Sequence, residues 1–279
     1  MLRRGARLTH EVPMSLRICL AGATGWAGSE LARGIAAADD LALVSAVARR
    51  HAGQKLADVL GEDGLDATIF GSAVEALTQA CDVFVEYTHP DSAKANILAA
   101  LEHGAHVVVG TSGLSDTDYA QIDALARERR RGVLACGNFA LTAVLLIKFA
   151  EMAAKLIPQW ELVDYASASK PDAPSGTVRE LATRMGKVRQ PRLEVPLEKT
   201  RGLRETRGGT LAGSQVHALR LPGFVIGAEA IFGMPDQTLT IRHNAGGSAK
   251  PYVDGALLAI RKVPGLVGLH RGLDAVLEL

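Results

Sequence analysis

The sequence predicts an α/β protein with a doubly wound parallel sheet, plus a second α+β domain with a mainly antiparallel sheet. Two patterns predict this fold class. From residue 16 to residue 136, short apolar runs alternate with amphipathic stretches, which is typical of the strands and crossover helices of a parallel sheet. Further on, three consecutive strand-like runs are separated by Leu-Pro-Gly and Met-Pro-Asp breakers. At 279 residues, the chain is long enough for two domains.

The expected elements follow this division. In the first domain, the expected strands are 16–21, 41–48, 83–87, 106–109 and 133–136, and the expected helices are 27–38, 74–80, 92–103 and 116–131. In the second domain, we expect a helix at 141–157, a strand at 161–167, a helix ending near 187, and an antiparallel meander of strands 215–221, 224–232 and 237–243. The tail, at 251–262 and 268–277, returns to helical spacing.

The domain boundaries are expected at the change of pattern. Residues 16–138, completed by 249–279, would form a dinucleotide-binding domain, and residues 139–248 a domain for substrate binding and oligomerisation. Residues 1–15 carry basic side chains but no apolar run, so we expect a disordered leader and not a secretory signal, with Met14 as an alternative start.

Composition excludes several classes of function. The formal net charge is +1, so no field over the whole surface would gather nucleic acid or an anionic membrane. The apolar stretch at 141–157 is interrupted by three charged side chains and is not expected to span a membrane. Three widely spaced cysteines exclude a clustered zinc site and a disulfide framework, so we expect no metal and a cytoplasmic location.

A glycine-rich turn follows the first expected strand. Its residues Gly22, Thr24, Gly25, Trp26, Ala27 and Gly28 form a G-x-x-G-x-x-G variant that opens a helix. In a Rossmann-like domain, the first glycine permits a tight turn, the second lets the backbone approach a pyrophosphate, and the third lets helix and strand pack closely. This turn therefore predicts a dinucleotide site, with a merely flexible turn as the alternative.

Two arginines follow the second expected strand. A carboxylate usually binds the adenosine ribose there, whereas Arg49 and Arg50 would suit a 2′-phosphate. We therefore expect NADPH, with NADH possible. The alternative is that both arginines are solvated loop residues.

Later strand ends complete the predicted rim of the nucleotide site. Ligands of open α/β sheets bind outside the carboxyl ends of the strands, where small hydroxyl residues and free amides would contact the nicotinamide and its ribose. The residues expected there are Thr88, Gly110, Thr111, Ser112, Asn138 and Phe139.

The segment 170–177 is the strongest pattern in the second domain. Its sequence Lys-Pro-Asp-Ala-Pro-Ser-Gly-Thr leads into a helix whose free amides would bind a substrate carboxylate at Ser175, Gly176 and Thr177. Lys170 beside them would serve as counter-ion and, if buried, as catalytic proton donor. The alternative is a capped helix preceded by a surface lysine.

Taken together, these motifs resemble the 4-hydroxy-tetrahydrodipicolinate reductase (dihydrodipicolinate reductase) family. The resemblance runs from about Leu16 to the C-terminus, and the 170–177 string is its most specific part. It implies a cytoplasmic enzyme of lysine and diaminopimelate biosynthesis that reduces a cyclic unsaturated dicarboxylate with a nicotinamide hydride. It also implies a homotetramer assembled through the second domain, whose C-terminal helices return to the nucleotide domain.

The sequence departs from the family at two positions. Family members usually carry a His-His pair four and three residues before the lysine, the first for proton transfer and the second for substrate contact. Here Ala166 and Ser167 stand there, and neither relays a proton as imidazole does. His89, His217 and His243 are the candidate replacements, and Lys250 is the nearest cation where the family places a basic turn.

Two alternatives to the family reaction remain open. One is a reductase of the same fold that acts on another cyclic imine or unsaturated carboxylate, to which the loss of the imidazole pair is suited. The other is a catalytically silent NADPH-binding sensor, against which the preserved Lys170 argues.

Overall fold

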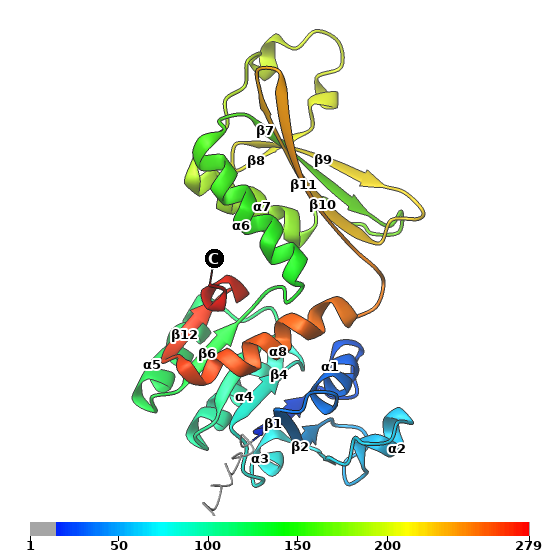
Figure 1. Ribbon diagram of the computed structural model, residues 1–279, viewed down its shortest axis with the longest axis vertical. Coiled ribbons are helices and arrows are strands. Elements are labelled where there is room, and N and C mark those ends of the chain that lie inside the picture. Colours follow the sequence, from blue (N-terminus) through cyan, green and yellow to red (C-terminus); the bar gives the residue numbers. More distant parts are fainter. Residues whose placement is uncertain (1–14, 279) are drawn as a thin grey trace, which may run out of the picture. The chain divides into compact units, whose positions relative to one another are not determined.

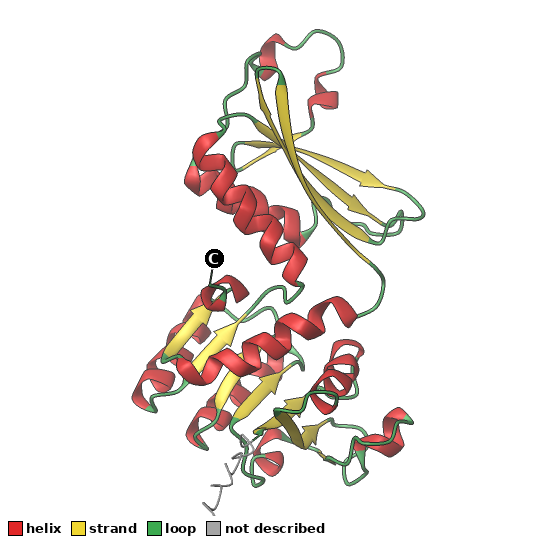
Figure 2. Cartoon of the chain, in the orientation of Figure 1, coloured by secondary structure: helices red, strands yellow, loops and turns green. Residues whose placement is uncertain are grey.

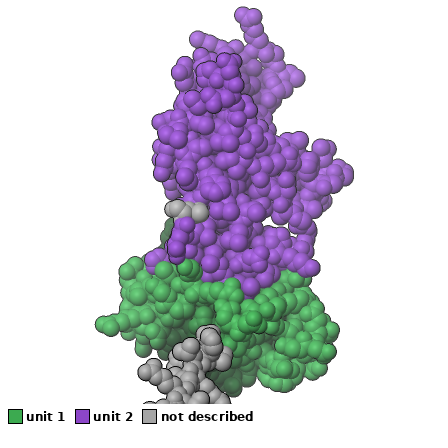
Figure 3. Space-filling model, in the orientation of Figure 1, with its two compact units in different colours: residues 1–133, 260–269 green, residues 134–259, 270–279 purple. Residues whose placement is uncertain are grey.

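The computed structural model describes residues 15–278, and the expected leader therefore lies, apart from Ser15, outside the described residues. The chain divides into two compact units (Figure 3). Unit 1 comprises the chain up to Val133 with Ile260–Leu269, and unit 2 comprises Leu134–Ala259 with His270–Leu279. The larger sheet lies mostly in unit 1 and the smaller sheet in unit 2, and the predicted fold class is confirmed.

The larger sheet has seven strands in the order β3-β2-β1-β4-β5-β6-β12 (Figure 1). Its strands are β1 Leu16–Ala21, β2 Leu41–Val47, β3 Thr68–Phe70, β4 Val83–Glu86, β5 His106–Val109, β6 Gly132–Ala135 and β12 Gly268–Arg271. The helices between them are α1 Trp26–Ala36, α2 Leu56–Leu60, α3 Ala73–Ala76, α4 Pro90–Glu102 and α5 Asp116–Glu128. Because β1 pairs in parallel with both β2 and β4, the strand order reverses direction beside β1, which is where ligands of such sheets bind.

Local sequence explains where these helices begin. The Ser115 hydroxyl accepts a hydrogen bond from the Asp118 amide, and the Asp118 carboxylate accepts one from the Ser115 amide, forming a capping box for α5. The Ser72 hydroxyl caps α3 by accepting a hydrogen bond from the Glu75 amide. Of the helix predicted at 74–80, only the single turn α3 at Ala73–Ala76 is observed, and α2 and β3 are elements that the sequence pattern did not predict.

The smaller sheet has five strands in the order β11-β10-β7-β9-β8. Its elements are β7 Trp160–Ala166, β8 Gly209–Leu211, β9 Ser214–Arg220, β10 Ile226–Met234 and β11 Gln237–Ala245, with helices α6 Leu141–Leu156 and α7 Gly176–Val188. The remaining elements are α8 Val253–Lys262 and the short 3-10 turns Leu197–Lys199, Arg204–Arg207, Lys250–Tyr252, Val263–Gly265 and Leu273–Val276. Helices α6 and α7 lie side by side against one face of this sheet (Figure 2).

Two predictions about this half of the chain are wrong. The runs at 215–221, 224–232 and 237–243 do not form a meander, because β7 lies between β9 and β10 and pairs in parallel with β9. The tail at 268–277 is not helical: β12 joins the edge of the larger sheet, and a short 3-10 turn follows it. Gly268 and Gly272 have φ of 81° and 87°, a conformation that ends any helix and favours glycine.

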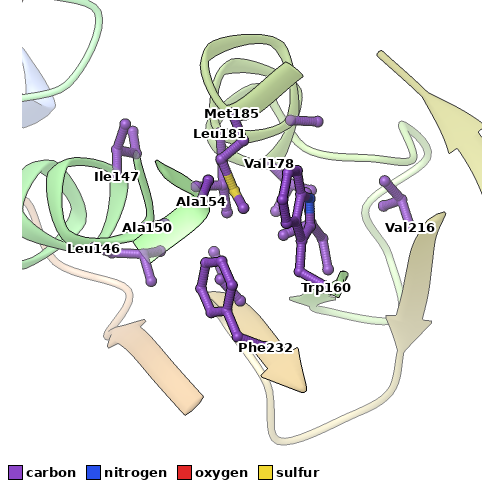
Figure 4. Close-up of a cluster of buried hydrophobic side chains, with 14 residues drawn as sticks. Leu146, Ile147, Ala150, Ala154, Trp160, Val178, Leu181, Met185, Val216 and Phe232 are labelled. Carbon is purple, nitrogen blue, oxygen red and sulfur yellow. The ribbon is translucent and has the colours of Figure 1, made fainter. Parts of the chain in front are cut away.

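The core of unit 2 lies between the smaller sheet and its two helices. Trp160 and Phe232 extend from the sheet toward Val178, Leu181 and Met185 of α7 (Figure 4). The two rings are in contact, with centroids 5.9 Å apart and planes inclined by 52°. The core thus fixes α7 against the strand that precedes the 170–177 segment.

A buried hydrogen bond inside this core gives a stability prediction. The Trp160 indole Nε1 donates to the hydroxyl of Ser214, whose side chain is inaccessible to solvent, at 2.9 Å. Trp160→Phe leaves that hydroxyl unpaired, so we expect the free energy of unfolding in urea to fall by about 1–3 kcal/mol. Adding Ser214→Ala removes the unpaired hydroxyl and should recover part of the loss. A change below about 0.5 kcal/mol in Trp160→Phe would contradict this account.

No helix among residues 15–278 is both long enough and apolar enough to cross a membrane. Within the same residues, no group of three or more His, Cys, Asp or Glu side chains has the arrangement of a metal site.

Candidate active site

A cavity of about 720 Å³ opens in unit 1 at the carboxyl ends of β1, β2 and β4. It brings together six of the residues predicted for the nucleotide site, namely Gly22, Thr24, Gly25, Arg49, Arg50 and Thr88. Its further lining includes His89, which the sequence analysis names as a candidate replacement imidazole, and Ser72 and Asn96, which sequence patterns did not single out. The cavity therefore lies at the reversal in strand order, where the sequence analysis expects a dinucleotide.

The glycines of the turn have the geometry that close approach requires. Gly22 has φ of 83°, and a Cβ there would lie 2.2 Å from the carbonyl oxygen of Tyr87. A Cβ on Gly28 would lie 2.0 Å from the carbonyl oxygen of Gly22, so only glycine lets α1 pack against this turn. Gly25 is exposed at the cavity and precedes the first turn of α1, whose free amides are suited to a diphosphate.

Arg49 and Arg50 follow β2 and are both exposed. Neither forms an ion pair with any part of the chain that the structure describes, so both guanidinium groups have donors available for a ligand. The residues present thus fit a dinucleotide that carries an additional phosphate.

The other predicted rim residues differ in their placement. Gly110 packs against the Tyr87 ring, since a Cβ there would lie 2.3 Å from a ring atom, and Thr111 bonds to Glu86. Ser112 is exposed, and Trp26 and Ala27 begin α1 without lining the cavity. Asn138 and Phe139 belong to unit 2, where the Asn138 side chain accepts a hydrogen bond from the Ala140 amide.

Glu86 is a further polar residue of this region that sequence reasoning missed. It ends β4, is completely buried, and accepts hydrogen bonds from the Thr88 amide at 2.8 Å, from Asn96 Nδ2 at 2.9 Å and from Thr111 Oγ1 at 3.3 Å. The Thr88 hydroxyl also donates to it. One carboxylate therefore orients two of the predicted rim residues and Asn96. Its signal in the sequence was a glutamate that ends an otherwise apolar strand.

The environment of Glu86 predicts a pH effect on stability. Burial raises the pKa of Glu86 above its ordinary value of 4.5, and its hydrogen bonds from Thr88 and Asn96 only partly offset this. The folded state thus binds the proton more tightly than the unfolded state, and this group's contribution to stability decreases as pH rises from about 4.5 through the raised pKa. We expect Glu86→Gln to remove that decrease. The check is urea unfolding of both proteins from pH 4.5 upward, and parallel pH profiles would contradict the assignment.

The 170–177 segment of unit 2 connects β7 to α7. The Ser175 hydroxyl caps α7 by accepting a hydrogen bond from the Val178 amide, and the exposed Gly176 begins the helix. The first turn of α7 contains no acidic residue that would occupy its free amides. The helix terminus is therefore open to an anion at Gly176 and Thr177.

Lys170 is partly buried and forms an ion pair within the segment. Its Nζ lies 2.8 Å from Asp172 Oδ1, and about a third of the side chain is exposed, at 32%. This ion pair holds the pKa of Asp172 below its usual range. The ammonium of Lys170 and the helix terminus at Gly176 and Thr177 thus lie within eight consecutive residues.

Residues 166 and 167 lie just before this segment. Ala166 ends β7 and is completely buried, while the Ser167 hydroxyl lies 3.0 Å from that of Ser169. His217 Nε2 bonds to Glu161 at 2.6 Å, near the start of β7, and His243 Nδ1 bonds to the Thr142 hydroxyl at 2.9 Å. These two imidazoles are therefore engaged away from the 170–177 segment.

A cavity at the reversal in strand order of a doubly wound sheet, and a unit that carries an ammonium beside an open helix terminus, are the features expected of a nicotinamide-dependent oxidoreductase. Two family models cover nearly the whole chain: "Dihydrodipicolinate reductase, N-terminus" matches residues 16–139 and "Dihydrodipicolinate reductase, C-terminus" matches residues 142–273. The chain belongs to the dihydrodipicolinate reductase family.

Individual relatives agree over the full length. The chain is 36% identical to 4-hydroxy-tetrahydrodipicolinate reductase of Geobacillus thermodenitrificans over 95% of this chain and 100% of that protein. Identity to the enzyme of the same name from Moorella thermoacetica is also 36%, over 95% of this chain and 98% of that protein.

Solved structures show the same fold. Dipicolinate-bound dihydrodipicolinate reductase from Paenisporosarcina sp. TG-14 superposes with a TM-score of 0.84 at 27% identity, covering 95% of this chain and 100% of that one. An amine dehydrogenase from Mycobacterium smegmatis superposes with a TM-score of 0.66 at 16% identity, covering 97% and 98%, and shares the fold.

Proposed function

We propose that this chain is a 4-hydroxy-tetrahydrodipicolinate reductase that transfers a hydride from NADPH to a cyclic unsaturated dicarboxylate in lysine and diaminopimelate biosynthesis. The observation that carries the proposal is the 170–177 segment, in which the ammonium of Lys170 precedes an open helix terminus at Gly176 and Thr177. A dicarboxylate presents the two features such a segment binds, negative charge and carboxylate oxygens. The relative from Paenisporosarcina is described as bound to dipicolinate, a dicarboxylate.

The preference for NADPH follows from the end of β2. Arg49 and Arg50 line the cavity. The stretch from Val47 to Arg50 contains no carboxylate that could bind the ribose hydroxyls. Guanidinium groups bind phosphate through charge-assisted hydrogen bonds. NADH remains a weaker second coenzyme in this proposal.

The chain's own groups have separate roles in the reaction. Gly22, Thr24 and Gly25 bind the diphosphate, and Glu86 orients Thr88 and Thr111 at the rim. When bound, the nicotinamide supplies the hydride. Gly176 and Thr177 orient a substrate carboxylate through helix amides, and Lys170 transfers a proton from Nζ to the substrate, so that one hydride and one proton add across the reduced double bond.

Ala166 and Ser167 make this chain a divergent family member in the proposal. A positioned general acid typically raises the reaction rate by about 100- to 10,000-fold. Because residues 166 and 167 carry no imidazole, Lys170 supplies the transferred proton in this proposal, and Ser167 contacts the substrate. The same two residues favour a second candidate function: reduction of a different cyclic imine or unsaturated carboxylate.

The quaternary state and location belong to the same proposal. Family likeness supports a cytoplasmic homotetramer assembled through residues 139–248, with the dinucleotide domain formed by 16–138 and 249–279. Sedimentation equilibrium of the purified protein tests the tetramer, and a monomer at all concentrations would overturn it.

A coupled assay tests the reaction. The purified chain is mixed with NADPH and the condensation product of pyruvate and aspartate semialdehyde, generated in situ, and NADPH consumption is followed. Turnover that requires the condensation product supports the proposal. NADPH binding without turnover would favour the second candidate and a screen of cyclic imines. Binding without turnover of any acceptor would favour a sensor.

A further inference from the structure

Asp164 is a buried carboxylate inside the second unit that none of the predicted roles uses. It lies on β7, two residues before Ala166, so both side chains project from the same face of the strand. Its side chain is completely inaccessible to solvent, and Arg220 Nη2 lies 2.7 Å from its Oδ2. Arg220 ends β9 and is the register partner of Ala166 on the neighbouring strand.

The Asp164–Arg220 pair forms hydrogen bonds with both halves of the 170–177 segment. The Ser175 amide donates to Asp164 Oδ2 at 2.8 Å, at the residue that caps α7. Arg220 Nη2 donates to the main-chain carbonyl of Asp172 at 2.7 Å. The side chain of Asp172 in turn pairs with the ammonium of Lys170. The pair therefore fixes the backbone beside the proton donor and the backbone at the carboxylate-binding helix terminus.

The pair is also incompletely satisfied. Asp164 Oδ1 and Arg220 Nε are buried and have no hydrogen-bond partner among the residues that the structure describes. Native proteins pair nearly all such atoms, so each exception calls for an explanation. Replacing a buried ion pair by well-packed apolar side chains often leaves the stability of a protein unchanged or increases it. Stability alone therefore does not explain why this pair is present. A buried, incompletely satisfied pair beside a candidate site is a local departure from optimal packing of the kind that functional sites show.

We propose that Asp164 and Arg220 are positioning residues that hold the 170–177 segment in the form required for reduction. The consequence for the reaction rests on the proposed function, whereas the consequence for the segment's geometry does not. In this arrangement, Asp164 fixes Ser175 and hence the amides of Gly176 and Thr177, and Arg220 fixes the carbonyl that precedes Ala173.

Asp164→Asn is the first test. The amide retains an oxygen for the Ser175 amide but loses the charge that pairs with Arg220. We expect kcat to fall by about 10- to 100-fold, since small displacements of positioned groups have effects of that size. Asp164→Glu, which keeps the charge, is expected to restore part of the rate. Hydrogen exchange at the Ser175 amide is expected to become faster in Asp164→Asn, a change that activity alone does not report.

A double variant separates positioning from folding. Asp164→Leu with Arg220→Met replaces the pair by apolar side chains and leaves no charge unpaired. We expect it to fold, with faster exchange at Ser175 and a kcat at least tenfold below the parent. Unchanged exchange at Ser175 together with kcat within threefold of the parent would overturn the proposal, whatever Asp164→Asn does.

The matched control is another arginine–carboxylate pair. Asp40 binds Arg261 through two hydrogen bonds of 2.7 Å in unit 1, outside the cavity lining. Asp40→Asn is expected to leave kcat within twofold of the parent. If the parent protein itself does not turn over the condensation product, the proposed function fails, while the exchange rate at Ser175 still decides whether the pair positions the segment.

Discussion

Lys170→Ala is expected to lower kcat for NADPH-dependent reduction by about 100- to 10,000-fold while leaving NADPH affinity within about twofold of the parent. That range is the usual contribution of a positioned general acid. Lys170 carries the only side-chain cation within the 170–177 segment, and Ala166 and Ser167, just before the segment, carry no imidazole. No second cationic side chain in the segment is therefore available to replace it.

The comparison for this variant is Lys187→Ala. Lys187 lies in the last turn of α7, at the opposite end of the helix from Gly176, and is exposed. Its removal changes the net charge by the same amount and should leave kcat unchanged. Steady-state kinetics on both variants decides the matter. If kcat of the Lys170→Ala protein stays within threefold of the parent, Lys170 is not the proton donor of the reaction.

The double variant Arg49→Ala with Arg50→Ala is expected to raise the Kd for NADPH by about 30- to 100-fold and the Kd for NADH by less than about threefold. A hydrogen bond to a charged group contributes about 1.5–3 kcal/mol, which corresponds to about 10- to 150-fold in affinity. Both side chains are exposed, so screening by salt keeps the combined effect near that of one such bond. Because the two coenzymes differ only in the 2′-phosphate, the difference between their changes in Kd measures the contribution of contacts with that phosphate.

Titration calorimetry with both coenzymes measures this effect. Arg33→Ala serves as the control because Arg33 lies on α1, in the same unit, but pairs with Glu30 and Glu62 and does not line the cavity. Its affinities should not change. Equal losses of NADPH and NADH affinity in the double arginine variant would show that these side chains do not recognise the phosphate.

The features that could be predicted from the sequence are those encoded locally. The turn from Gly22 to Gly28, the arginines after β2 and the 170–177 segment each lie in one short stretch, and the structure places them at a cavity edge or a helix terminus. In these stretches, glycine conformation and helix capping determine the geometry, and both are visible in a few consecutive residues.

The features that could not be predicted depend on which strands are neighbours. Interpreting β9, β10 and β11 as a meander separates Arg220 from Asp164, whereas the observed order inserts β7 and brings the two side chains within 2.7 Å. Burial of Glu86 is equally non-local, since its partners Asn96 and Thr111 come from α4 and from the loop after β5. Periodicity reports which face of a strand is buried but not its lateral partner.

The most direct test of the proposed reaction follows the hydride itself. NADPH deuterated at the transferred position is mixed with the protein and the condensation product of pyruvate and aspartate semialdehyde, and the reduced cyclic dicarboxylate is analysed by mass spectrometry. We expect a product that carries one deuterium, formed by the parent protein and strongly diminished with Lys170→Ala. Unlabelled product, or none while NADPH still binds, would contradict the assignment of this chain as a reductase of that substrate.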